Sequence, residues 1–168
     1  NKVPPVKNND TLRVAASKDY FLFLEDVDQS YWMGMFQYIK QDLKAKPPVS
    51  GTQLTYTPAH IMAELDYVDI HGYWRHPQGG WISLTAKEPW TIDNDAMVNT
   101  LANIKDRLAV QRVYNKPYTI SEYNHPYPNQ YGAEGQPMLC IYGRLQGWDG
   151  VFQYSYNHYV NDFELQAN

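Results

Sequence analysis

The chain has 168 residues, of which 43% are hydrophobic and 19% charged, and this is enough apolar material for a buried core. The length fits one domain or part of one, and it is too short for a complete eight-unit β/α barrel, which needs about 250 residues. A net charge of -4 without a cluster of Lys and Arg argues against nucleic acid as a partner, and the absence of a run of about 18 apolar residues argues against a membrane span.

Targeting and metal signals are missing from the sequence. The composition and the absence of a long apolar run predict a soluble chain. The segment that starts at Asn1 has neither the charged nor the apolar region of a signal peptide, so we expect no signal peptide in this chain. The compartment stays open, and a secreted parent enzyme is one alternative. No pair of His or Cys residues has the compact spacing of a zinc motif, so we predict neither a metal nor a cofactor.

The N-terminal quarter of the chain reads as a lead-in followed by a helix. Residues 1–16 contain prolines and several polar residues, which predicts an extended segment. From about residue 17 to residue 44, apolar residues recur at spacings of three and four, and Ser17 can serve as the N-cap. This pattern predicts a long amphipathic helix that ends before Pro47 and Pro48.

Strands and helices then alternate along the chain. Strands are predicted at residues 49–54, 67–73 and 151–156, and a further strand that delivers Glu122 lies within residues 116–126. Helices are predicted at 58–65, 93–113 and 133–145, with a long loop at 75–91 and a polar tail at 157–168. Alternation of strands and helices predicts parallel β/α units in one domain over residues 17–156.

The strand at 67–73 has two different faces. Side chains alternate along a strand, so Val68 and Ile70 share one face and should pack against helices. Asp69, His71 and Tyr73 share the other face, which in a barrel would point into the lumen.

Two segments carry residues typical of sugar chemistry. They are Leu65-Asp-Tyr-Val-Asp-Ile-His-Gly-Tyr-Trp-Arg-His-Pro77 and Lys116-Pro-Tyr-Thr-Ile-Ser-Glu-Tyr-Asn-His-Pro126. Both resemble the sixth and seventh strands of clan A glycoside hydrolases, which are TIM barrels that cleave glycosidic bonds with retention by means of two carboxylates. The resemblance implies an α/β fold that is half of a TIM barrel, with about four parallel strands matching the fifth to the eighth.

The same resemblance implies roles for three residues. Glu122 matches the nucleophile that closes the seventh strand, Tyr73 the tyrosine that holds it ionised and oriented, and His71 a histidine of the same network. In the family a general acid/base glutamate follows an asparagine on the fourth strand, and this chain contains no Asn-Glu pair. The isolated chain is therefore expected to be inactive or very weak.

Aromatic and amide side chains near these segments suit a carbohydrate ligand. The chain has 15 Tyr and 5 Trp, and pyranose rings stack on aromatic faces while their hydroxyls bond to amides and carboxylates. The predicted substrate-binding residues are Asn124, His125, Trp74, Gln53, Trp81 and Tyr123. The alternative for each single residue is a packing or surface role.

The sequence therefore predicts a fragment or half-barrel of a retaining glycoside hydrolase that acts on oligo- or polysaccharides with β-linkages. Its expected partner is a second copy of the chain or a missing N-terminal half-barrel, since half of a parallel sheet leaves edges and a face uncovered. The alternative is a non-catalytic half-barrel that binds carbohydrate or assembles with itself.

Overall fold

A computed structural model describes residues 11–79, 90–100 and 104–156 of the chain. Its first element is the long helix α1 (Thr11–Gln37), which continues into the short π-helix η1 (Tyr38–Asp42). The other elements, in which η denotes a short 3₁₀- or π-helix, are α2 (Ala59–Met62), β1 (Val68–Tyr73), β2 (Gln78–Gly79), β3 (Trp90–Thr91), η3 (Met97–Asn99), η4 (Ile104–Leu108), η5 (Ala109–Gln111), β4 (Tyr118–Asn124), η6 (Gly132–Glu134), α3 (Gly135–Gln146) and β5 (Gly150–Gln153).

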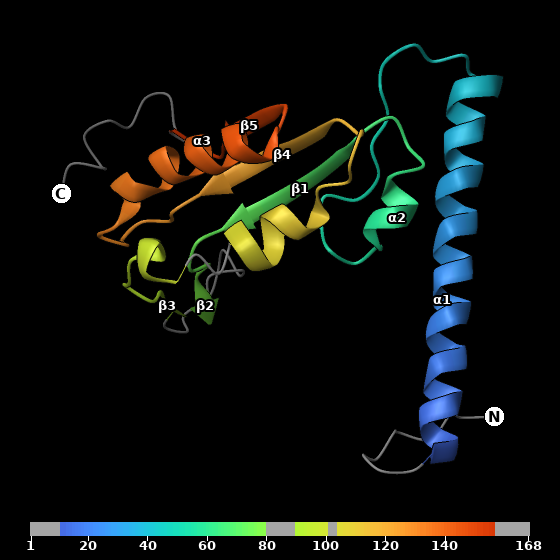
Figure 1. The fold of residues 1–168 in the computed structure, drawn as a ribbon, viewed down its shortest axis with the longest axis horizontal. Coiled ribbons are helices and arrows are strands. Elements are labelled where there is room, and N and C mark those ends of the chain that lie inside the picture. The colour runs from blue at the N-terminus through green and yellow to red at the C-terminus, as the bar shows by residue number, and fades with distance from the viewer. Residues whose placement is uncertain (1–10, 80–89, 101–103, 157–168) are drawn as a thin grey trace.

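The centre of the molecule is a parallel sheet with the strand order β1-β4-β5 (Figure 1). Helical segments connect its strands, since η4 and η5 precede β4 and α3 precedes β5. The predicted parallel α/β arrangement is thus confirmed for three strands. The described residues form no fourth parallel strand and close no barrel. A separate two-stranded ribbon, β2 with β3, is antiparallel.

The prediction of a strand at residues 49–54 is wrong, because this segment forms no strand in the structure. Val49 forms both of its backbone hydrogen bonds with Asp66, one to the carboxylate and one to the backbone N–H, before β1 begins. The next link is from His71 N to Gln53 O at 2.8 Å. The segment therefore lies beside the outer edge of β1, but its bonds do not keep the regular spacing of a strand ladder.

Two predicted helices differ from the structure. Because α1 begins at Thr11, residues 11–16 are helical rather than part of an extended lead-in, and Ser17 lies inside the helix. The helix predicted at 93–113 is divided into η3, η4 and η5. Its start is not capped by Asp93, because the Glu134 carboxylate accepts the N–H groups of Met97 and Val98 from another part of the chain.

The helix α1 exposes apolar side chains in every direction. It stands at one end of the sheet (Figure 1), and Trp32, Met33 and Phe36 are the side chains through which its described part packs against the core. Among the described residues, no helix has the length and apolar character needed to cross a bilayer. The prediction that one apolar side of this helix is buried is wrong, because residues expected on that side are exposed together with their neighbours on the helix. The exposed set includes Val14, Tyr20, Phe21, Leu22, Phe23, Leu24, Val27, Tyr31 and Met35.

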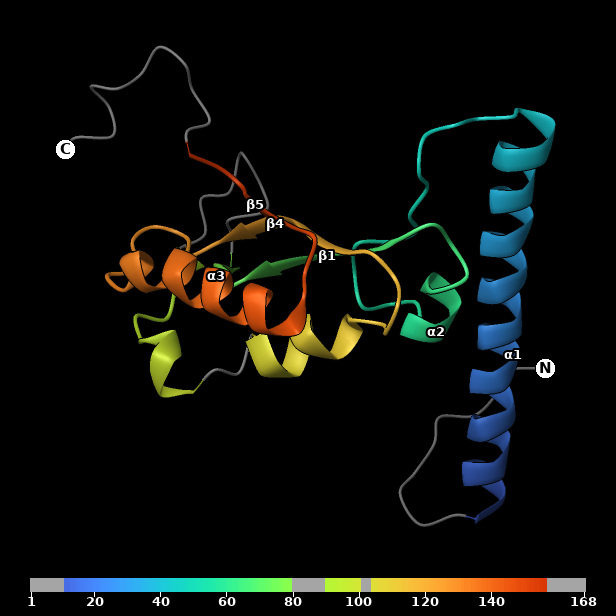
Figure 2. The ribbon, with the colours of Figure 1, turned by 45° about the horizontal axis from the view of Figure 1, so that its top comes forward.

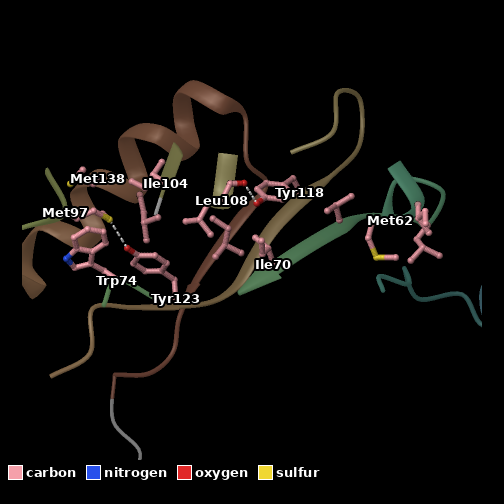
Figure 3. Packing of buried hydrophobic residues seen from close by; sticks show 14 residues of the cluster. Met62, Ile70, Trp74, Met97, Ile104, Leu108, Tyr118, Tyr123 and Met138 are labelled. Carbon is pink, nitrogen blue, oxygen red and sulfur yellow. Dashed lines mark hydrogen bonds between the residues drawn. The ribbon is translucent and has the colours of Figure 1, made fainter. Parts of the chain in front are cut away.

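The hydrophobic core lies on one face of the sheet, where α3 and the segment 104–111 pack (Figure 2). We call this the core face, and the sheet contributes Val68 and Ile70 from β1 and Tyr118, Ile120 and Tyr123 from β4. Figure 3 shows the Tyr118 hydroxyl donating to the Leu108 carbonyl, at 2.5 Å. The two-faced pattern predicted for β1 is confirmed on this side.

Burial of Tyr118 predicts a loss of stability at alkaline pH. Desolvation, with a smaller effect of the Asp69 charge, raises the pKa of Tyr118 above its ordinary value, whereas tyrosines of the unfolded chain titrate at about 10. Above that pH the unfolded chain binds fewer protons than the folded chain, so the free energy of unfolding falls as pH rises. We expect Tyr118→Phe to make this fall shallower by up to about 1.4 kcal/mol per pH unit, measured by urea unfolding at a series of pH values.

The matched control for this prediction is Tyr114→Phe, because Tyr114 is 83% exposed. It should leave the alkaline slope as in the parent chain. An equal slope in the parent and in Tyr118→Phe would show that Tyr118 ionises in the folded state as it does in the unfolded one.

Candidate functional site

A β-bulge in β4 decides which face of the sheet carries Glu122. Ile70 of β1 lies opposite Ile120, but the next residue, His71, lies opposite Glu122. β4 therefore contains one extra residue, Ser121. In a regular strand Glu122 would share the core face with Ile120, because side chains alternate. The bulge instead places Ser121 and Glu122 together on the opposite face, as bulges near functional sites commonly do.

We call this opposite side of the sheet the polar face. β1 contributes to it the predicted lumenal set Asp69, His71 and Tyr73, and β4 contributes Thr119, Ser121 and Glu122. Every one of these side chains is hydrogen-bonded to another member of the set.

Glu122 is held by one group on each of its carboxylate oxygens. The Tyr73 hydroxyl donates to Oε1, and Nδ1 of His71 lies 3.2 Å from Oε2. The Glu122 side chain keeps 24% of its surface exposed, so a ligand can reach it. The structure thus brings together the three residues that the resemblance selected, at the carboxyl ends of two neighbouring parallel strands. This is the edge where barrel enzymes carry their catalytic groups.

Tyr73 is in a suitable state to act as a donor to this carboxylate. Its partial burial is the largest cause that raises its pKa, and the hydrogen bond and negative charge of Glu122 raise it further. The His76 ring contacts the Tyr73 ring edge-on, with centroids 4.9 Å apart. The phenol therefore keeps its proton at ordinary pH and donates a hydrogen bond to Glu122.

A second carboxylate, Asp69, lies beneath this pair. It is 7% exposed and accepts hydrogen bonds from the Thr119 hydroxyl at 2.5 Å, from the Ser121 hydroxyl at 2.5 Å and from the Ser121 backbone N–H at 3.1 Å. The Ser121 oxygen also lies 3.0 Å from Nε2 of His71. Sequence reasoning missed Ser121 and Thr119, although their spacing of two residues in the strand is a signal that both share one face.

Three predicted substrate-binding residues lie instead on the core face. Trp74 is 3% exposed, and its indole N–H donates to the Asp95 carbonyl at 2.8 Å. Tyr123 is fully buried, and its hydroxyl contacts Met97 Sδ at 3.3 Å. His125 is buried beside it, and desolvation lowers its pKa below the ordinary value. The structure therefore places these three side chains in the core. After the bulge the alternation turns Tyr123 and then His125 towards it, whereas Trp74 continues the face of β1 that carries Val68 and Ile70.

The other predicted substrate-binding residues lie nearer to Glu122 or outside the described part of the chain. Asn124 follows Glu122 by two residues, and its Oδ1 accepts the His125 backbone N–H at 2.8 Å. The exposed Gln53 lies beside His71 through its carbonyl group. Trp81 falls in 80–89, outside the described residues.

A cleft of about 680 Å³ adjoins the site on the polar face. Ser121 and Thr119 line it from β4, Phe152 follows from β5, and Tyr67 and Pro117 lie at the starts of the strands. On the side away from the sheet, Lys40 lines the cleft and forms an ion pair with Asp66 at 2.6 Å. The cleft runs from the amino ends of the strands towards the Asp69 network.

Metal chemistry finds no support at this site in the part of the chain that the structure describes. No group of three or more His, Cys, Asp and Glu side chains there could hold a metal ion. What the site can do is hold the Glu122 carboxyl group in a fixed orientation, offer it to a ligand, and move protons along the hydrogen bonds that join it to His71 and, through Ser121, to Asp69.

Comparison of the chain with protein-family models, with curated proteins and with solved structures gives no match. A function for this chain must therefore be argued from the geometry of the polar face.

The contact between Tyr73 and Glu122 can be tested by titration. Glu122→Gln removes the negative charge and keeps the shape, so we expect the pKa of Tyr73 to fall towards the ordinary range while burial keeps it raised. The measurement is NMR of the chain labelled at the tyrosine ring carbon that bears the hydroxyl, with the Tyr73 signal assigned from Tyr73→Phe. The Tyr118 signal is an internal control, because its charged neighbour is Asp69 rather than Glu122. An unchanged Tyr73 titration in Glu122→Gln would mean that the two groups are not in contact.

Proposed function

We propose that this chain carries the nucleophile side of a retaining glycoside hydrolase that acts on β-linked glycans, with Glu122 as the nucleophile. The observation that supports it is the arrangement at Glu122, where Tyr73 binds one carboxylate oxygen and His71 lies at the other, on the polar face. A carboxylate held from both oxygens has little freedom to rotate. It can therefore be kept ready to attack an anomeric carbon.

The reaction would begin with attack of a Glu122 oxygen on the anomeric carbon of the bound sugar. The bond from that carbon to the leaving oxygen breaks, its electron pair departs with the leaving group, and a glycosyl ester forms on Glu122. Water then attacks the same carbon and gives one proton to the acid/base group, the bond from the carbon to the Glu122 oxygen breaks, and the sugar is released with the carboxylate restored. The Tyr73 phenol stays protonated throughout, so it can remain a hydrogen-bond donor while Glu122 loses and regains its negative charge.

Retention also needs an acid about 5 to 5.5 Å from the nucleophile to protonate the leaving oxygen. Asp69 does not suit this role, because it is buried and already accepts three hydrogen bonds. We propose that the acid comes from the elements that complete a barrel around the polar face. These are an N-terminal half-barrel or a second copy of the chain.

In this proposal the sheet is part of half a TIM barrel over residues 17–156. β1, β4 and β5 would correspond to the sixth, seventh and eighth strands. The segment 49–54 would take the place of the fifth, since it lies along the outer edge of β1 at Gln53. The sugar would lie over the carboxyl ends of these strands, near Asn124 and Gln53.

A probe that does not need the missing acid tests the nucleophile directly. Dinitrophenolate is a weak base that leaves without protonation, so a dinitrophenyl fluoroglycoside requires only the nucleophile to form the glycosyl ester. We expect a panel of such β-glycosides, with gluco, galacto and manno configurations, to add one sugar mass to the chain for at least one configuration. Peptide mass spectrometry should place this sugar on Glu122.

The variant Glu122→Gln should lose the label completely, because an amide does not form the ester. The control is Glu64→Gln, which changes an exposed glutamate and should label like the parent. Labelling of a different carboxylate, or no labelling by any member of the panel, would contradict Glu122 as the nucleophile.

The second candidate function is self-assembly, and the exposed apolar surface of α1 favours it. Isolated apolar side chains are common on protein surfaces, but α1 exposes many of them together, among them the successive residues Phe21, Leu22, Phe23 and Leu24, each at least 41% exposed. Large exposed apolar surfaces mark interaction sites. A second copy of the chain would cover them and bring two Glu122 sites into one assembly.

We expect light scattering to show a dimer for the parent chain and a monomer for Phe23→Asp, because a charge at the centre of the apolar run opposes its burial. Leu145→Asp on α3 is the control, since Leu145 is 74% exposed and away from α1. A parent chain that stays monomeric would count against self-assembly, and it would leave the N-terminal half-barrel as the partner.

A further inference from the structure

The hydrogen bonds around Asp69 fix the direction of the Ser121 hydroxyl. Asp69 accepts from three donors, namely the Thr119 hydroxyl, the Ser121 hydroxyl and the Ser121 backbone N–H. A carboxylate is an acceptor only, so in each of these contacts the hydrogen comes from the hydroxyl or the N–H group. The single proton of Ser121 therefore points to Asp69.

This direction determines the proton on His71. Since Ser121 has given its proton to the bond with Asp69, its oxygen can only accept from Nε2 of His71, at 3.0 Å. Nε2 must then carry a proton. On the other side of the ring, Nδ1 lies 3.2 Å from Oε2 of Glu122, and this pair also needs a proton between them. Besides the proton on Nε2, His71 and Glu122 therefore share one further proton. The pair is then either an imidazolium with a carboxylate or a neutral imidazole with a carboxylic acid.

We propose that Asp69 is a positioning residue for Glu122, which acts through Ser121 and His71. By holding the Ser121 hydroxyl, Asp69 keeps Nε2 of His71 protonated and so directs the shared proton to the Oε2 side of Glu122. The role in catalysis rests on the proposed function, because it concerns Glu122 as a nucleophile. With the proton on His71, the carboxylate faces an imidazolium and is in the state that attacks sugar.

A rival assignment uses the same three groups differently. Ser121, His71 and Glu122 stand in the order of a serine hydrolase triad, with Oγ near Nε2 and the carboxylate near Nδ1. In that assignment the Ser121 hydroxyl would donate to His71, and Nε2 would carry no proton. The hydrogen bond from Ser121 to Asp69 opposes it, because a serine that donates to a carboxylate is not activated by the histidine.

The protonation of the His71 nitrogens distinguishes the two assignments. We expect the long-range proton–nitrogen NMR spectrum of the histidine-labelled chain, at about pH 8 and thus above the ordinary titration range of histidine, to show Nε2 of His71 in the protonated range. His71→Asn assigns the signal among the five histidines. An unprotonated Nε2 with a protonated Nδ1 in the parent chain would overturn the proposal and support the triad.

We call the series of hydrogen-bonded groups Asp69, Ser121, His71 and Glu122 the relay. Two variants break this relay at different points. In Asp69→Asn the amide can donate to Ser121, which frees the Ser121 hydroxyl to donate to His71, so the Nε2 signal should move to the unprotonated range. Ser121→Ala removes the acceptor of Nε2 and should give the same shift with less risk to folding, because Ser121 is an exposed side chain. Thr119→Val is the control, since it removes a bond of Asp69 that does not lead to His71. A Nε2 signal that stays in place in both relay variants would show that Asp69 does not control His71.

The same variants relate this relay to the proposed function. If Glu122 is the nucleophile, Asp69→Asn should slow the labelling of Glu122 by about tenfold or more, as expected when an orienting aspartate no longer fixes its histidine. If Glu122 is never labelled and His71 still depends on Asp69, the relay stands and the glycosidase function fails. If Glu122 is labelled and His71 does not depend on Asp69, the function stands and the relay is wrong.

Discussion

The β-bulge in β4 is the constraint on which the rest of the site depends. Without the extra residue, alternation would turn Glu122 into the core beside Ile120 and would place Tyr123 on the open side. A carboxylate in that core would have no partner and would cost several kcal/mol to bury. The bulge avoids this cost and at the same time delivers two successive polar residues, Ser121 and Glu122, to β1. One irregular residue thus separates a continuous apolar layer from a continuous hydrogen-bonded layer within a single strand.

The two layers stabilise each other through Asp69. This aspartate is almost fully buried on a central pair of strands, and burial of a charged group is tolerated only when hydrogen bonds replace the lost water. Thr119 and Ser121 supply these bonds from β4 and therefore also fix the register of β4 against β1. The bond from Ser121 also leads to His71, so the aspartate that joins the two strands is linked through Ser121 to the group that holds Glu122.

The sequence predicted this site better where the strand is regular than where it is not. The alternation of β1 correctly separated Val68 and Ile70 from His71 and Tyr73, because a regular strand has a period of two. The same rule cannot anticipate a bulge, because a bulge depends on how β4 pairs with the strands on either side of it. For that reason the burial of Tyr123 on the core face was not expected. The segment 49–54 was predicted as a strand from its composition alone. Its backbone hydrogen bonds go to Asp66 and His71, and the distance between these two partners along the chain does not match the regular ladder of a strand.

The exposure of α1 was not expected, because apolar spacings of three and four indicate a helix but do not show what covers it.

The openness of the polar face bears on how Glu122 would react under the proposed function. Parallel sheets are normally covered on both faces, and the described helices α3 and η4 pack on the core face. On the polar face the cleft beside Ser121 is open, so water reaches the groups around Glu122 and weakens each electrostatic interaction there. Elements that cover this face would exclude that water and strengthen the bonds from Tyr73 and His71. They would also bring the acid that the described residues do not offer. The hydrogen bonds that lead from Asp69 to Glu122 lie within the sheet and are complete without such a cover, so the orientation of Glu122 is a property of this chain. Under the proposed function, the rate at which Glu122 reacts would depend on the elements that cover the polar face.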